Sequence, residues 1–302
     1  MASIVRQPAR LLKDPDDARV GELRPYVPLL GVPWDWSTAG RPGARHAPSA
    51  IRGELLSLRP LSHDLGPLGV GFDDLGDVNV VGGDAKETSR RAVEAASQAL
   101  ELAKSRRVPA VFLGGDHSIT GWTSLPAVSS GAALVVLDSH YDLRRPSEGV
   151  TSGSWLRELA ESVKGLKAMV VGVADYVNPA YAPSRAQQLG VRVLPRSALL
   201  DSADQAIREV MDFVRGREVY LSIDMDHLDQ SFAPGVNSPT PLGMTPYESL
   251  RVIRAVASAA SAVVGIDVVE VVPYLDPTGG TARLAASLVL SAVHASIRGE
   301  AR

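Results

Sequence analysis

Short apolar segments alternate with longer segments of helical periodicity along most of this 302-residue chain. The apolar segments have the length of buried strands and comprise residues 27–31, 108–113, 133–137, 168–173, 219–223 and 263–268. Apolar residues recur at helical spacing in residues 86–105, 204–215, 246–260 and 282–298. Strands that alternate with helices form parallel sheets, and uniformly apolar strands suit a sheet covered on both faces. The sequence therefore predicts an α/β fold, a three-layer α/β/α sandwich with a mainly parallel sheet, in one domain spanning residues 1–302.

The composition excludes several classes of function. A formal net charge of -3 and no visible basic patch argue against a nucleic-acid partner or an anionic membrane. The chain has no cysteine, which excludes disulfides, thiolate ligands and a cysteine nucleophile. The first dozen residues lack the apolar core of a signal peptide, and no later segment looks long and apolar enough to span a bilayer. We expect a cytoplasmic protein.

Chemically active residues follow three of the expected strands. Asp138, His140 and Asp142 come directly after residues 133–137, at alternating positions that share one face of an extended chain. Asp224 and Asp226 follow residues 219–223, and His117 follows residues 108–113 in a Gly-Gly-Asp-His sequence. Because parallel strands present their carboxyl ends at one edge of the sheet, these side chains are expected to meet there. Four carboxylates in one place repel one another, so the pattern indicates a divalent cation.

Simpler interpretations exist for each residue alone. The glycine pair before His117 is common in strand-to-helix turns, and an aspartate after a strand often caps a helix. Asp267 and Glu270, after residues 263–266, could likewise cap a helix or pair with an arginine. The other four histidines have no ligand partner at a suitable spacing, so surface or packing roles are expected for His46, His63 and His294. His227 differs only in standing next to Asp226.

The number of candidate ligands favours two ions. Two imidazoles and four carboxylates exceed the four ligands that zinc prefers, and the oxygen-rich set suits Mn²⁺. If Asp138 and Asp224 bridge two ions, then His117 and Asp142 complete the coordination of one ion. His140 and Asp226 then complete the other. Two such ions lower the pKa of a water between them, which indicates metal-assisted hydrolysis.

The same residues, with further motifs, make the chain resemble the ureohydrolases, the family of arginase, agmatinase, guanidinobutyrase and formimidoylglutamase. The resemblance spans nearly the whole chain and rests on residues 40–45, 48–52, 76–78, 114–118, 138–142, 222–226 and 267–273. It implies a parallel-sheet α/β fold, two Mn²⁺ per subunit on the ligands named above, and a trimer or hexamer. It also implies cleavage of a C–N bond in a guanidino or formimino group. Glu270 would face the cationic group of the substrate, and Asp267 would orient a metal ligand.

Departures from the family pattern bear on the substrate. Arginases and agmatinases have a proton-shuttle histidine on the loop after Asp142, but this loop has none, and Gly153 stands in its place. The loop with Ser152 and Gly153, and residues 234–239, are similar to formimidoylglutamases, whereas residues 40–45 are closer to agmatinases. The resemblance thus favours N-formimidoyl-L-glutamate, hydrolysed to L-glutamate and formamide, with Asp142 or a metal-linked water carrying the proton. Arg144 and Arg145 are candidate partners for the substrate carboxylates.

Three alternatives stay open. An agmatinase or other guanidino hydrolase would release urea instead. A catalytically silent member could keep the metal site after losing the histidine, although all six candidate ligands are present. A deacetylase-like enzyme with a single zinc fits the surplus of aspartates poorly.

Overall fold

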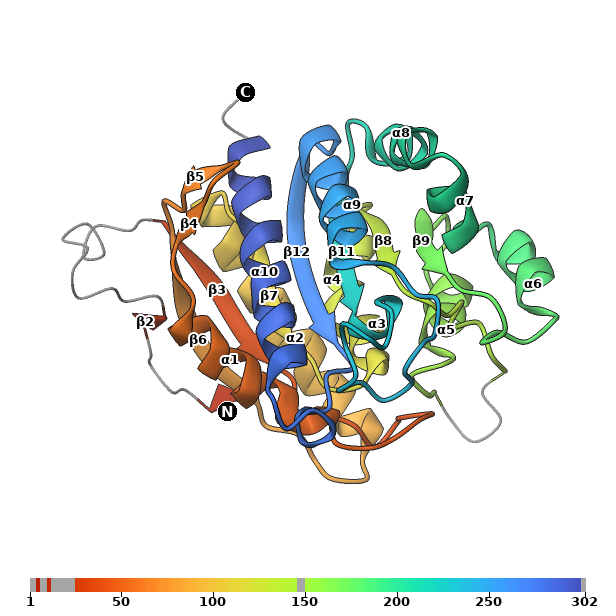
Figure 1. Ribbon diagram of the computed structural model, residues 1–302. Helices are drawn as coiled ribbons and strands as arrows, with labels where there is room; N and C mark the ends of the chain where they lie inside the picture. The colour runs from red at the N-terminus through yellow and green to blue at the C-terminus, as the bar shows by residue number, and fades with distance from the viewer. Residues whose placement is uncertain (1–3, 6–9, 12–24, 146–149, 300–302) are drawn as a thin grey trace.

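The computed structural model describes residues 4–5, 10–11, 25–145 and 150–299, and its centre is a single large sheet (Figure 1). Within those residues the sheet has ten strands, in the order β1-β6-β3-β7-β12-β11-β8-β9-β10, with β2 also paired to β6. Strands β6 to β10 along this order are parallel, and only β1 and β2 run antiparallel to β6 at one end. The strands are β1 (Ile4–Val5), β2 (Arg10–Leu11), β3 (Tyr26–Gly31), β6 (Gly71–Val78), β7 (Ala110–Leu113), β8 (Ala133–Leu137), β9 (Ala168–Val173), β10 (Arg192–Pro195), β11 (Glu218–Asp224) and β12 (Ala262–Val269).

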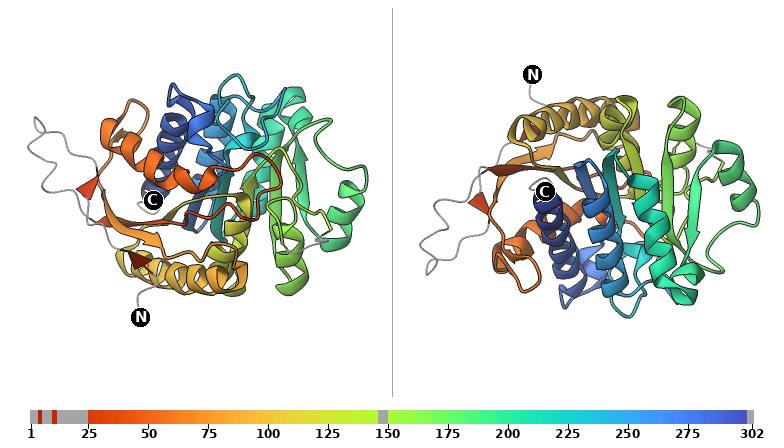
Figure 2. Two further views of the ribbon diagram at one scale, coloured as in Figure 1. Left: turned by 90° about the horizontal axis from the view of Figure 1, so that it is seen from below. Right: turned by 90° about the horizontal axis from the view of Figure 1, so that it is seen from above.

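Helices cover both faces of the sheet, as the end-on views in Figure 2 show. One layer contains α1 (Ala47–Ser57), α7 (Arg196–Asp201), α8 (Ala203–Val214), α9 (Pro246–Ala259) and α10 (Gly280–Gly299), which contact one another in the order α1-α10-α9-α8-α7. The other contains α2 (Ala85–Arg106), α3 (Thr120–Thr123), α4 (Leu125–Ser129) and α5 (Trp155–Ser162), with α6 (Ala182–Leu189) beside β10. The three-layer α/β/α prediction is confirmed.

All six expected strands and all four expected helices are present, with ends that differ by at most two residues. The expectation about membrane spans is wrong in one respect, because residues 280–297 of α10 are long and apolar enough to cross a bilayer by composition. This segment is 61% buried, and α10 packs against α1, α9 and β12. Its apolar character therefore reflects its position in the core.

One strand that the sequence pattern did not predict is β6. Its alternating burial and its aspartates hide the strand from a search for apolar segments. Asp74 is buried there because Arg52 of α1 binds both of its carboxylate oxygens, over 2.9 and 3.0 Å, and also binds Asp77 over 2.7 Å. Two of the motifs that carry the family resemblance, residues 48–52 and 76–78, thus hold α1 against β6.

The four central strands end at the same level. Ile223 of β11 lies beside Leu137 of β8, and Val268 of β12 lies beside Leu113 of β7. Since β7, β12, β11 and β8 are adjacent and parallel, the residues that follow them are brought to one edge of the sheet.

Candidate metal centre

The first group of ligand atoms surrounds His117. This residue begins the short 3₁₀ helix His117–Ile119, whose N-cap Asp116 accepts a hydrogen bond from the amide of Ser118. Nδ1 of His117 lies 2.9 Å from Oδ2 of Asp224, 3.0 Å from Oδ2 of Asp142 and 3.2 Å from Oδ2 of Asp138. One ring nitrogen carries at most one proton, so hydrogen bonding alone does not account for three oxygens at this distance.

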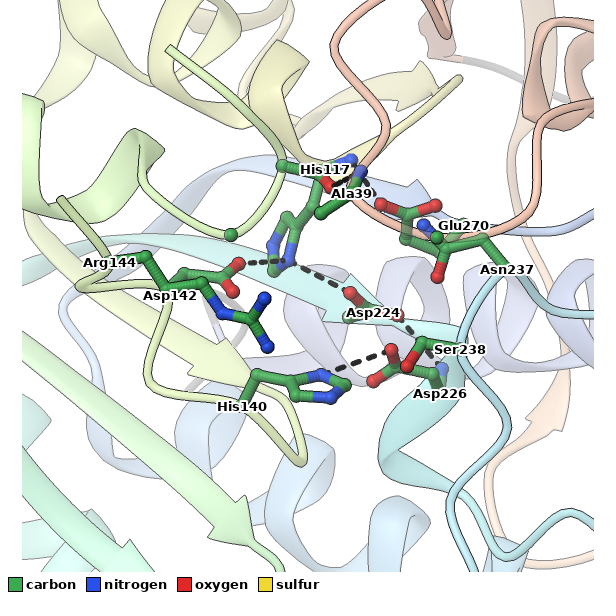
Figure 3. A pocket seen from close by; sticks show the side chains of 13 residues that line it. Ala39, His117, His140, Asp142, Arg144, Asp224, Asp226, Asn237, Ser238 and Glu270 are labelled. Atoms are coloured by element: carbon green, nitrogen blue, oxygen red, sulfur yellow. Dashed lines mark hydrogen bonds and ion pairs between the residues drawn. The ribbon is translucent and has the colours of Figure 1, made fainter. Parts of the chain in front are cut away.

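A second group lies next to the first (Figure 3). Nδ1 of His140 is 3.2 Å from Oδ2 of Asp226 and 3.4 Å from Oδ1 of Asp138. Asp138 therefore uses one oxygen toward each histidine, as a carboxylate that bridges two ions would. The ligand atoms form two sets, and within each set all atoms lie within 4.8 Å of one another. One set comprises His117, Asp138 and Asp224, and the other comprises Asp138, His140 and Asp226.

Local hydrogen bonds explain why these carboxylates point inward. The amide of His140 donates to Oδ1 of Asp138 over 2.6 Å, and the amide of Asp226 donates to Oδ1 of Asp224 over 2.8 Å. In each pair an aspartate at a strand end accepts the amide two residues later, which is the geometry of an Asx turn. The repeated Asp-x-(His/Asp) spacing therefore builds the same turn twice, on neighbouring strands.

A chain of hydrogen bonds fixes the orientation of the His117 ring. Nε2 of His117 lies 3.1 Å from the hydroxyl of Ser222, and this hydroxyl donates to Oδ1 of Asp267 over 2.6 Å. Because the only hydroxyl proton is directed to Asp267, the Ser222 oxygen must accept a hydrogen bond from the Nε2–H of His117. Nδ1 then presents its lone pair to the cluster when an ion is bound. Tyr220 donates to the other oxygen of Asp267 over 3.0 Å and so holds this chain in place. Asp267 thus contacts His117 through Ser222 rather than directly.

The surrounding protein groups alone do not balance the negative charge of the clustered aspartates. Burial, reinforced by the charge of Asp138, raises the pKa of Asp142 to about 6, and burial also raises the pKa of Asp226 to about 6. Burial and the neighbouring Asp226 raise the pKa of Asp224 well above its ordinary value. Burial opposes a charged His140, but Asp226 and Asp138 outweigh it and raise the pKa of His140 to about 12. In the absence of a cation, protons are therefore held where ions would bind.

The donor set fits hard divalent ions. Adjacent ligands of an octahedral ion with bonds of about 2.1 Å are about 3.0 Å apart, which is close to the separations around His117. Oδ2 of Asp138, Oδ1 of Asp226 and Nδ1 of His117 are buried and have no hydrogen-bond partner within the described residues. Buried polar atoms without partners are costly, and an ion would satisfy them.

Glu270 lies beside the cluster but is not one of the candidate metal ligands. Its Oε1 accepts the amide of His117 over 2.7 Å, whereas its buried Oε2 has no hydrogen-bond partner in the part of the chain that the structure describes. Its backbone has a left-handed φ of 67°, which is uncommon for glutamate and typical of functional sites. Burial and the nearby Asp224 raise the pKa of Glu270 well above its ordinary value. A cation that enters the pocket can therefore pair with the free oxygen.

The cluster opens into a pocket of about 60 Å³. Besides the ligand residues and Glu270, its walls contain three residues expected from the sequence, Arg144, Ser152 and Gly153, and four that sequence reasoning did not select, Ala39, Gly40, Asn237 and Ser238. Gly40, Asn237 and Ser238 stand in residues 40–45 and 234–239, which the family comparison of the sequence had named, and Ala39 directly precedes the first of these segments. Arg145 is exposed and does not line the pocket. Residues 146–149 of this loop lie outside the described residues.

The remaining histidines lie away from the pocket. His46 and His63 are exposed, and His294 is buried in α10. His227 is buried and hydrogen-bonded through Nε2 to the hydroxyl of Ser249 over 2.8 Å, and burial lowers its pKa to about 4. It packs beneath the cluster as a neutral side chain.

Both the fold and the sequence have counterparts among known proteins. Residues 26–295 match the model of the arginase family, and the chain belongs to that family of hydrolases, which act on guanidino and amidino groups. A formimidoylglutamase of Halobacterium salinarum is 35% identical over 91% of this chain and 93% of its own length. An agmatinase of Gallus gallus is 34% identical over 86% of this chain and 78% of its own length. The structure of formimidoylglutamase from Bacillus subtilis superposes with a TM-score of 0.82 at 28% identity, covering 97% and 96% of the two chains.

Proposed function

We propose that the protein is a binuclear manganese hydrolase that converts N-formimidoyl-L-glutamate to L-glutamate and formamide. The observation that carries this proposal is the pairing of opposite charges across one small pocket. The Arg144 side chain is directed toward the cluster from one wall, and Glu270 lies at another wall (Figure 3). The substrate has a cationic formimino group and two carboxylates, so it complements a pocket with a free carboxylate and a guanidinium.

The candidate residues divide into three roles. His117, Asp138, His140, Asp142, Asp224 and Asp226 would hold two Mn²⁺, which when bound supply a water nucleophile at neutral pH. Oε2 of Glu270 would accept hydrogen bonds from the formimino nitrogens and orient the carbon that is attacked. Arg144 would bind a substrate carboxylate, with Ser152 and Gly153 shaping the adjacent wall. Arg145 would contribute only charge, because it lies outside the pocket.

Proton transfer to the leaving nitrogen is assigned to Asp142. Its Oδ2 lies at the cluster, and the residue is 7% exposed, so it is accessible from the pocket that it lines. A carboxylate beside the nucleophilic water could accept its proton and return it to the leaving nitrogen. No histidine is present between residues 141 and 155 to take this role.

The rival substrate is agmatine, since an agmatinase is a relative of similar identity. The distal amine of agmatine is cationic, and Arg144 would repel it at the pocket wall. This charge relationship favours the dicarboxylate substrate over the diamine.

Product analysis distinguishes the candidates. Manganese-loaded protein is offered formimidoylglutamate and agmatine in parallel, and Asp138→Ala serves as the control for metal-dependent turnover. Formamide and glutamate would support the proposal, and urea would identify a guanidino hydrolase. No product from either substrate, with manganese bound, would favour a catalytically silent member or an untested amidine.

The assembly into trimers or hexamers stays a proposal that rests on the family resemblance, and the cytoplasmic location stays a proposal from the sequence pattern. Light scattering on the purified protein tests the assembly, with a mass of three or six chains of 31.9 kDa as the expected result.

A further inference from the structure

The buried side chain of Trp155 contacts two of the candidate ligands. Its indole N–H donates to Oδ2 of Asp142 over 2.7 Å, the same oxygen that lies 3.0 Å from Nδ1 of His117. The indole also packs against the imidazole of His117, with 4.8 Å between the ring centroids. The sequence pattern gave no role to this residue, which is the first of α5.

Asp142 is the candidate ligand that most requires such support. Its backbone has a left-handed φ of 51°, which is uncommon for residues other than glycine. Asp142 also stands outside both sets of tightly convergent ligand atoms, which contain the other five residues. Its carbonyl accepts the amide of Arg157 in α5 over 3.3 Å. The N-terminal turn of α5 therefore holds both the main chain and the side chain of Asp142.

We propose that Trp155 is a positioning residue that holds the Asp142 carboxylate against His117 for the ion bound on that side of the cluster. This role rests on the proposed function. A carboxylate oxygen has two lone pairs, so Oδ2 of Asp142 can accept the indole proton and still face the ion, while Oδ1 stays available. Ser222 orients His117 from the opposite side, so the His117 side of the cluster is supported by two hydrogen bonds from outside the ligand set.

The test compares two substitutions of the same kind. Trp155→Phe removes the indole donor and keeps an aromatic ring, and Trp34→Phe is the matched control. Trp34 and Trp155 are both 1% exposed, but the indole of Trp34 donates to the hydroxyl of Ser37, which is not a candidate ligand. Manganese binding is measured by calorimetric titration of the metal-free full-length proteins. We expect Trp155→Phe to weaken one of the two binding events about 10- to 100-fold and to leave the other unchanged.

A second replacement guards against misfolding of the phenylalanine variant. Benzothienylalanine incorporated at position 155 keeps the bicyclic ring and lacks the N–H donor, so it should weaken the same binding event. Wild-type affinity, or tighter binding, in both position-155 proteins would overturn the role of Trp155 alone. Failure of the wild-type protein to bind Mn²⁺ would overturn the proposed function together with this role.

Discussion

Gly153 lies directly against the side chain of Arg144. A Cβ atom built at position 153 would stand 3.1 Å from Cδ and 3.4 Å from Nε of Arg144. At the position where the family resemblance places a proton-shuttle histidine, this chain has a glycine, and the Arg144 side chain fills the adjacent space. The absence of the histidine and the placement of Arg144 are therefore linked.

Replacement of Gly153 by histidine should therefore displace Arg144. We expect Gly153→His to raise the KM for formimidoylglutamate by about tenfold or more, because the guanidinium loses its position next to the substrate carboxylate. Steady-state kinetics measure this, with Gly153→Ala expected to show a smaller rise because one methyl needs only a slight shift. An unchanged KM in Gly153→His would refute the link between the two residues.

Removal of the guanidinium itself gives a direct test. Arg144→Ala should raise the KM for formimidoylglutamate by about 10- to 100-fold, the effect of one charge-assisted hydrogen bond of about 1.5–3 kcal/mol. The kcat should change less, because the group binds a part of the substrate that does not react. Arg145→Ala is the matched control and should leave KM close to that of the wild type. Equal effects at the two positions would contradict the assignment of Arg144.

The hydroxyl of Ser222 should control metal affinity through His117. Ser222→Ala removes the oxygen that accepts the hydrogen bond from Nε2–H of His117, and we expect manganese affinity to fall about 10- to 100-fold. The control is Ser249→Ala, which removes a similar buried hydroxyl from His227, a histidine outside the candidate ligand set. Calorimetry measures both variants. Equal losses of affinity would indicate general loosening of the fold instead of a specific role.

Metal should stabilise the fold because it binds groups that repel one another without it. A saturating ion that binds only the folded state, at 100 times its dissociation constant, adds about 2.7 kcal/mol. We expect the Tm of metal-free protein to rise on addition of Mn²⁺ and to fall again with a chelator. Asp138→Ala, which removes the shared carboxylate, should lose most of this response. A Tm that does not respond to Mn²⁺ in the wild-type protein would contradict the metal assignment.

The fold was predictable where the local pattern and the tertiary environment agree. Residues 133–137 read as a buried strand and are fully buried in β8. β6 escaped prediction because its buried Asp74 depends on Arg52 of another element, and a search along the chain does not reveal that pairing. Such strands need knowledge of which distant side chain supplies the opposite charge.

The candidate site, like the fold, was predictable from the sequence only in part. Asp138, His140, Asp224 and Asp226 were selected because alternate positions after a strand share one face, and the structure brings them together through Asx turns. Trp155 was missed because nothing in its neighbourhood along the chain marks an indole as a partner of a carboxylate 13 residues away. Ser222 was missed because its role arises only where Asp267 and His117 meet across adjacent strands.

We propose that two ions share this cluster, with Asp138 between them. Anomalous diffraction at the manganese edge, from crystals grown with Mn²⁺, locates such ions. We expect two peaks about 3.5–4 Å apart, one near His117 and one near His140, each within bonding distance of an Asp138 oxygen. A single peak, or none at these residues, would contradict it.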